Sequence, residues 1–140
     1  MNFSKFIYIE EDHYFNGRAI VIFDCTQGFK LKKSMHAELM TYIMSTFMKA
    51  LDKSKEVVQI EELGVIVNLK NFQTCKIGIK FIMQLVKLFK IVFADKLYKC
   101  IMKDPPIIFR SIFTIISPFI DRKTRRKISF IKNGKKIHEY

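Results

Sequence analysis

The sequence predicts an α/β domain with a mixed, mostly parallel sheet of about four to five strands flanked by helices. Residues 18–24 and 64–69 form continuous apolar runs, the pattern of strands buried on both faces. A segment with helical spacing of apolar residues follows each run, at 35–51 and 75–93. This alternation of strand and helix is typical of a largely parallel sheet. No internal repeat or linker divides the chain, so we expect one domain over residues 1–140.

The amino-terminal half predicts two strands and one long helix. Residues 3–10 alternate well enough for a first strand, and Asn16-Gly17 marks the turn into the second strand at 18–24. We expect Ser34 to cap the helix of residues 35–51. The segment that follows this helix, residues 57–60, fits either a short strand or a loop.

A third segment of strand, helix and strand organises the rest of the chain, from Tyr98 to Phe130. Residues 99–103 suit a strand, Asp104 offers a helix cap, and Pro105-Pro106 fits a first helical turn. From 107 to 116 the polar side chains form one narrow stripe: Arg110, Ser111 and Thr114.

A helix as apolar as residues 107–116 must be covered on most of its circumference. The sheet of the domain can cover one side. A lipid, a membrane or a second protein could cover the other, and the plainer alternative is a core helix packed beneath the carboxyl-terminal tail.

The charge predicts anionic partners. Twenty-five Lys and Arg stand against 13 Asp and Glu, giving a net charge of +12, and residues 121–140 hold eight basic and two acidic side chains. Such a balance attracts phosphate-rich membranes or nucleic acid, unless it reflects only a coding bias toward Lys. No aromatic platform or recognition motif accompanies the basic tail at 133–140, so we expect no nucleic-acid partner.

Membrane-spanning and secreted proteins are disfavoured. The longest nearly apolar run, 107–120, has 14 residues, whereas a membrane span needs about 20. The acidic Glu10-Glu11-Asp12 comes too early for a signal peptide. The cysteines are odd in number and widely spaced, which predicts buried free thiols in a reducing, cytosolic compartment: Cys25, Cys75 and Cys100.

Motifs of enzymes and metal sites are absent. The sequence contains no glycine-rich phosphate loop, no HExxH and no GxSxG. His13, His36 and His138 lack the spacing of metal ligands, and the side chains of the adjacent Glu61 and Glu62 point apart. We expect neither a catalytic nor a metal site.

Residues 17–130 resemble the CRAL-TRIO family of lipid-binding domains. GRAIVIFD (17–24) and GVIVNLKN (64–71) resemble two of its strands, and FADKLYKCIMKDPPIIF (93–109) resembles a further strand and the start of its gating helix. The closing segment SPFIDRKTRRKISF is the most specific match, because these residues keep the family spacing: Pro118, Phe119, Asp121, Thr124, Lys127 and Ile128.

The resemblance implies a non-catalytic lipid-binding or lipid-transfer module, cytoplasmic and peripheral on membranes. An apolar gate helix at about 106–119 would cover a cavity that holds one phospholipid, with a phosphoinositide as the candidate, and no other cofactor. The gate and cavity residues would be Ile108, Phe109, Ile112, Phe113, Ile116, Phe119, Phe81 and Leu85. The lipid headgroup would contact Asp95, Lys96, Thr124 and Lys127. The basic cluster expected to dock on anionic membranes is Arg122, Lys123, Arg125 and Arg126.

The family's helical N-terminal partner region has no counterpart here, so we expect a minimal domain with a basic tail at 133–140. In this respect and in RAIVIFDC (18–25) the chain also resembles the BCH branch of the family. That branch implies the alternative function of a protein-interaction scaffold, a homodimer or a partner of small GTPases and their regulators.

Overall fold

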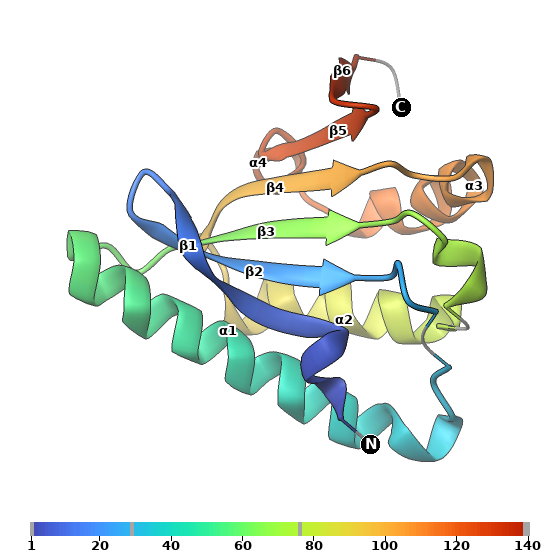
Figure 1. Ribbon diagram of the computed structural model, residues 1–140, viewed down its shortest axis with the longest axis horizontal. Coiled ribbons are helices and arrows are strands. Elements are labelled where there is room, and N and C mark those ends of the chain that lie inside the picture. The colour runs from blue at the N-terminus through green and yellow to red at the C-terminus, as the bar shows by residue number, and fades with distance from the viewer. Residues whose placement is uncertain (1, 29, 76, 139–140) are drawn as a thin grey trace.

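The computed structural model describes residues 2–28, 30–75 and 77–138, which form an α/β domain around one mixed sheet (Figure 1). Strands β2 to β5 are parallel, while β1 and β6 pair antiparallel at the two edges. The six strands lie in the sheet in chain order: β1 (Ile7–Phe15), β2 (Arg18–Asp24), β3 (Leu63–Asn68), β4 (Leu97–Lys103), β5 (Ile128–Lys132) and β6 (Lys135–Ile137).

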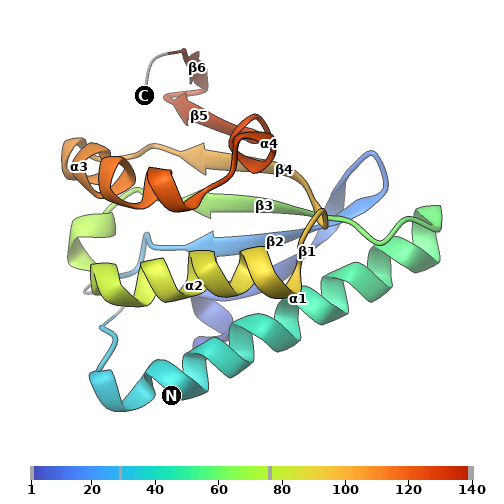
Figure 2. The ribbon, with the colours of Figure 1, turned by 180° about the vertical axis from the view of Figure 1, so that it is seen from behind.

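The helices all lie on one side of this sheet, as the view from behind shows (Figure 2). Connections between neighbouring parallel strands are almost always right-handed, and strands that follow one another in a single direction therefore send every connection over the same face. The α-helices are α1 (His36–Val58), α2 (Ile79–Val92), α3 (Ile107–Ile116) and α4 (Arg122–Arg125). Short 3₁₀ turns are η1 (Phe3–Lys5), η2 (Lys33–Met35), η3 (Phe72–Thr74) and η4 (Ser117–Phe119).

The core fills the space between the sheet and these helices. Alternate strand residues point into it, as a pleated sheet requires, and aromatic rings join the layers. Phe23 of β2 packs edge-on against Phe47 of α1, with ring centroids 6.0 Å apart. Phe130 of β5 packs in the same way against Phe113 of α3, at 5.1 Å.

The predicted α/β fold is confirmed, with more strand than expected. The sheet has six strands rather than four to five, because β6 lies where the sequence suggested only a tail. The tight turn at Asn133-Gly134 makes this hairpin, since both residues have positive φ, as hairpin turns of two residues require. The last two residues of the predicted tail, Glu139 and Tyr140, lie outside the described residues.

Several predicted boundaries were wrong. The first strand begins at Ile7 rather than residue 3, since η1 precedes it. Helix α1 continues to Val58, so residues 57–58 are neither strand nor loop, and Gln59 ends the helix in a left-handed conformation. Helix α2 begins only at Ile79, not at residue 75.

Both predicted caps were also wrong. Ser34 lies inside η2, and Met35 precedes α1 without a capping side chain. Asp104 has a positive φ of 50°, which takes it out of the helical path, and its Oδ1 accepts a hydrogen bond from the Asn133 N–H at 2.9 Å. Pro106 is the residue that starts α3. Asp104 therefore ties β4 to the β5–β6 turn instead of capping a helix.

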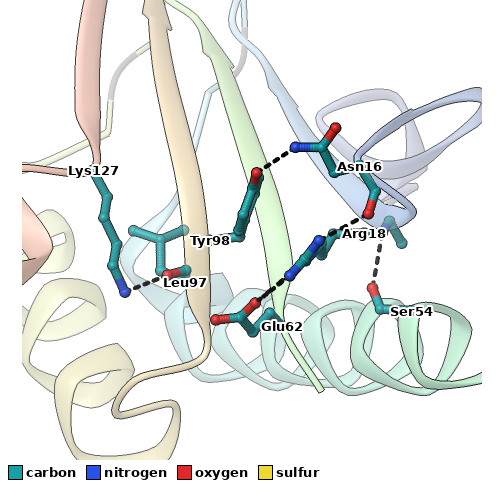
Figure 3. A network of polar contacts seen from close by, with 8 residues as sticks. Asn16, Arg18, Ser54, Glu62, Leu97, Tyr98 and Lys127 are labelled. Carbon is teal, nitrogen blue, oxygen red and sulfur yellow. Dashed lines mark hydrogen bonds and ion pairs between the residues drawn. The ribbon is translucent and has the colours of Figure 1, made fainter. Parts of the chain in front are cut away.

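A polar network joins the amino ends of the central strands (Figure 3). The Arg18 guanidinium of β2 bonds Glu62, just before β3, at 3.1 Å and lies 4.2 Å from the ring centre of Tyr98 in β4. The Asn16 amide in the β1–β2 turn donates to the Tyr98 hydroxyl. These contacts tie together the β1–β2 turn, β2, the residue before β3 and the start of β4.

The buried Ser54 attaches α1 to the sheet. Its hydroxyl accepts a hydrogen bond from the Ala19 N–H of β2 at 2.8 Å (Figure 3). It also donates to the Ala50 carbonyl at 3.0 Å. Both Ser54 and Ala19 are fully buried, so no water can replace the hydroxyl.

Ser54→Ala is expected to lower the free energy of unfolding by about 1–3 kcal/mol, because it leaves the Ala19 N–H buried without a partner. Urea denaturation followed by circular dichroism measures the change. Ser45→Ala, on the exposed side of the same helix, is the control and is expected to change stability by less than about 0.5 kcal/mol. Equal losses in the two variants would contradict the role assigned to Ser54.

Candidate functional site

A cavity of about 220 Å³ lies between the sheet and the helices α2 and α3. Val65 and Val67 of β3, with Cys100 and Met102 of β4, form its floor. Its walls come from α2 and from the α3–η4 segment, which face each other across these strands in Figure 2. The lining is almost entirely apolar, so the cavity suits a hydrocarbon group and offers nothing to bind a polar one in its interior.

Aromatic rings pack on both sides of the cavity. On the α2 side, Phe89 and Phe93 pack edge-on against Phe47 of α1, at 5.2 and 5.4 Å. On the α3 side, Phe109 packs against Phe72 at 5.4 Å. Of the α2 residues, Phe81 is the fully buried one, while Ile82, Leu85 and Val86 line the cavity and stay half-exposed.

The predicted gate and cavity residues separate into three groups. Those that line the cavity are Phe81, Leu85, Phe109, Ile116 and Phe119. Phe113 and Ile112 instead belong to the core beside it, Phe113 against Phe130. Ile108 faces outward and is 55% exposed.

The outer side of α3 is apolar and exposed. The helix buries Phe109, Phe113 and Ile116, and its predicted polar stripe shares the outer side with three isoleucines. These are Ile107, Ile108 and Ile115, of which Ile107 is 88% exposed. Nothing among the described residues covers this side. The sequence predicted that most of the circumference of this helix is covered, and the described residues cover only the side toward the sheet.

Polar side chains gather at one end of the cavity, where η4 runs into α4. Three of them line it: Lys90, Asp121 and Thr124. Asp121 caps α4, its carboxylate accepting the Thr124 N–H at 2.7 Å, and this hydrogen bond lowers the pKa of the Asp121 carboxyl. Lys87 lies over the ring of Phe119, 4.9 Å from its centre, on the same side. The cavity therefore has a single polar end.

The structure brings together three of the four residues assigned to a lipid headgroup. Asp95 forms an ion pair with Lys123 at 2.8 Å, which lowers the pKa of the Asp95 carboxyl, and Lys127 contributes to the same shift. Thr124 lies one turn before Lys127, accepting the Lys127 N–H through its carbonyl at 3.0 Å.

Two of the predicted headgroup contacts have other partners. The Lys96 ammonium lies 3.7 Å from the Glu61 carboxylate, in the segment before β3, rather than at the polar end of the cavity. The Lys127 ammonium donates to the Leu97 carbonyl at 2.7 Å (Figure 3). That single bond leaves two of its three hydrogens for another acceptor.

The predicted docking cluster is also divided by its contacts. Lys123 is paired with Asp95, and the Arg125 guanidinium donates to the carbonyls of Ser117 and Ile120, which close η4. Arg122, the first residue of α4, and Arg126, which directly follows the helix, are exposed. Lys90 and Asp121 were missed as site residues, although Asp121 belongs to the most specific motif. Lys90 has no motif at all, and only the packing of α2 places it at the cavity.

The three cysteines are free and buried, as their number and spacing predicted. Burial raises the pKa of the Cys100 thiol to about 12, so it is an unreactive part of the cavity floor. In the described part of the chain, no group of three or more His, Cys, Asp or Glu side chains is arranged to hold a metal ion. None of the described helices has the length and hydropathy needed to cross a bilayer.

The comparisons with known proteins agree on the fold. The family model of the CRAL/TRIO domain matches residues 3–140. Among solved structures, the crystal structure of Sfh5 is similar, with a TM-score of 0.55 at 15% identity over 91% of this chain. The match covers 47% of the Sfh5 chain, so this chain spans about half its length. No curated protein matches the sequence.

Asp121→Ala is expected to loosen α4 by about 0.5 kcal/mol, the low end for a helix cap, because the helix is short and exposed. Faster hydrogen exchange of the Thr124 amide measures this loss. The folded-state pKa is lowered, so the cap is present above the unfolded-state pKa of about 3.9 and is lost as the pH falls through the folded value. The difference between wild type and variant should therefore vanish in acid. Asp52→Ala, on the exposed side of α1, is the control. An equal increase in the hydrogen exchange of the Thr124 amide in this variant would contradict the role of Asp121 as a helix cap.

Proposed function

The chain belongs to the CRAL/TRIO family of domains, and from this premise we propose that it binds a lipid, with one acyl chain in the cavity and the headgroup at the polar end. One observation carries the proposal: the described residues that line the cavity are apolar except at one end, where Lys90, Asp121 and Thr124 lie. An amphiphile has the same division. An enclosed hydrocarbon chain gains ~0.8 kcal/mol for each buried methylene.

The volume favours one chain over two. Pockets that enclose drug-sized ligands measure about 300–1,000 Å³, and this cavity of about 220 Å³ lies below that range. A full two-chain phospholipid therefore does not fit without movement of α2 or α3. We propose that one chain of the lipid enters, while the rest stays at the surface between these helices.

A phosphate group suits the polar end. The Lys127 ammonium and the Thr124 hydroxyl are the proposed donors, with Lys90 as a third cation beside them. Asp95 bonds Lys123 through one carboxylate oxygen, and its other oxygen is the proposed acceptor for a hydroxyl of an inositol ring. Lys96 contacts Glu61 and is not among the proposed ligands of the phosphate. A phosphoinositide would therefore be held by fewer of the predicted groups than the sequence suggested.

The outer side of α3 and the basic end of α4 are proposed to dock on an anionic membrane. Three exposed isoleucines can enter the interface, and Arg122 and Arg126 can attract acidic lipids at ~1 kcal/mol each. Both features lie on the side of the sheet where the cavity opens (Figure 2). A lipid could thus pass between bilayer and cavity without crossing water.

Val86→Phe should reduce lipid binding about tenfold, because the ring fills space equal to about two methylenes of the ligand, ~1.6 kcal/mol. Native mass spectrometry of the purified protein, followed by solvent extraction, measures the bound lipid. Leu88→Phe is the matched control, since Leu88 lies on α2 outside the cavity lining. A wild-type protein without extractable lipid that also takes up none from vesicles would overturn the proposed function.

Arg122→Gln combined with Arg126→Gln should weaken binding to phosphatidylserine vesicles by ~2 kcal/mol, about thirtyfold, at low salt. Sedimentation with vesicles measures this change, and high salt should remove most of it. The control pair is Lys103→Gln with Lys136→Gln, on the opposite side of the sheet. If the two pairs weaken binding equally, docking depends on net charge and not on α4.

A further inference from the structure

The side of the sheet opposite the helices, called here the helix-free face, is apolar along its middle. Residues paired across strands share a face, and one row of pairs runs from Ile22 through Ile66 and Ile101 to Ser129. All four side chains are half-buried. No described helix covers them, and Figure 1 shows this side toward the viewer.

A parallel sheet with one open apolar face is unusual. Parallel strands occur almost only where both faces are covered, and antiparallel sheets are the ones that tolerate solvent on one side. Here the four central strands are parallel. The continuous apolar sequence of β2 and β3 has the character of strands covered twice, while the described residues provide cover for one side.

The β1–β2 hairpin covers only one end of the helix-free face. Gly64 lies so close to the ring of Phe15 that an added Cβ would come within 2.3 Å of it. The Lys99 ammonium lies 5.3 Å from the centre of the same ring. The amino end of β3 is thus closed, and the uncovered area extends over the remainder of β3 and over β4, β5 and β6.

A hollow of about 160 Å³ lies in this uncovered area and is lined by isoleucine, serine and lysine side chains. Its lining residues are Lys99, Ile101, Ser129, Ile131 and Lys136. Lys103 is paired with Ile131 and so shares its face. No acidic residue of β4, β5 or β6 lies among them, since these strands contain none.

We propose that the helix-free face binds an amphipathic helix of a partner protein, with an apolar stripe on the isoleucines and acidic residues against Lys99, Lys103 and Lys136. A helix is the element that covers parallel sheets in α/β folds. Acidic flanks are complementary to these lysines, which makes opposite charge the basis of partner choice.

A second copy of this chain fits the face poorly. Two such faces in contact would each bring an excess of lysines, which the carboxylate of Asp24 in the row with Asn68 and Lys103 offsets only in part, in a chain with a net charge of +12. A flat bilayer fits poorly as well, because the half-buried isoleucines share the hollow with exposed lysines. The proposal is independent of lipid binding, since the cavity and α4 are on the other side of the sheet (Figures 1 and 2).

The test uses the whole chain labelled with ¹⁵N and a synthetic 18-residue amphipathic peptide that carries a leucine stripe flanked by glutamates. The expected result is a shift of the amide signals of β3 to β6 on titration. Lys103→Glu with Lys136→Glu should weaken binding at least tenfold, and Arg122→Glu with Arg126→Glu, the same change of charge on α4, less than threefold. A peptide of identical composition with the leucines scrambled should bind at least tenfold more weakly.

Four results would overturn the proposal. The peptide fails to bind, or its signals map to α2, α3 and α4, or the two charge reversals weaken binding equally. The fourth is another occupant of the face: a dimer by light scattering whose contact shifts these same amides, or protection of the strands from hydrogen exchange by phosphatidylserine vesicles. Lipid extracted from the same preparation reports on the cavity separately, so each proposal can fail alone.

Discussion

The right-handedness of the crossover connections is the constraint on which this structure depends. Six strands lie in chain order, and each of the three parallel steps advances across the sheet in the same direction. Right-handed connections then have one side available, so α1, α2 and the α3–α4 segment all lie there. The asymmetry of the molecule follows directly: one face of the sheet holds a core with a cavity, and no helix of the described residues lies on the other.

Aromatic side chains fill that core on both sides of the cavity. Phe47, Phe89 and Phe93 form one cluster under α2, and Phe113 with Phe130 forms another under α3. Aromatic rings favour edge-on contacts with centroids 4.5–7 Å apart. Each cluster provides such contacts for its own helix. The strands between the clusters carry smaller side chains, Val65, Val67 and Cys100, which do not fill the gap. Side chains pack closely in the two aromatic clusters, and the space between the clusters is left unfilled. A site for an apolar ligand requires such a space.

The candidate site was predictable where it depends on a continuous motif. The segment 117–130 places Phe119, Asp121 and Thr124 in the lining of the cavity, and the resemblance to the family implied two of them as site residues, Phe119 and Thr124. The sequence did not indicate contacts with partners far along the chain. Lys96 lies near Glu61, and Asp104 accepts a hydrogen bond from Asn133 instead of capping α3. These contacts depend on the order of the strands in the sheet and on the conformation of the turns. A local sequence pattern contains no information about either.

By itself the sequence determined the fold class, the positions of the four central strands and the apolar character of α3, because these follow from the period and length of hydrophobic runs. The tertiary structure alone decided that α3 turns three isoleucines outward, that Lys90 reaches the cavity and that no described helix covers one face of the sheet. The reason is that hydrophobic periodicity states how many sides of an element are apolar. Which neighbour covers each side is settled only when the handed connections place the elements in space.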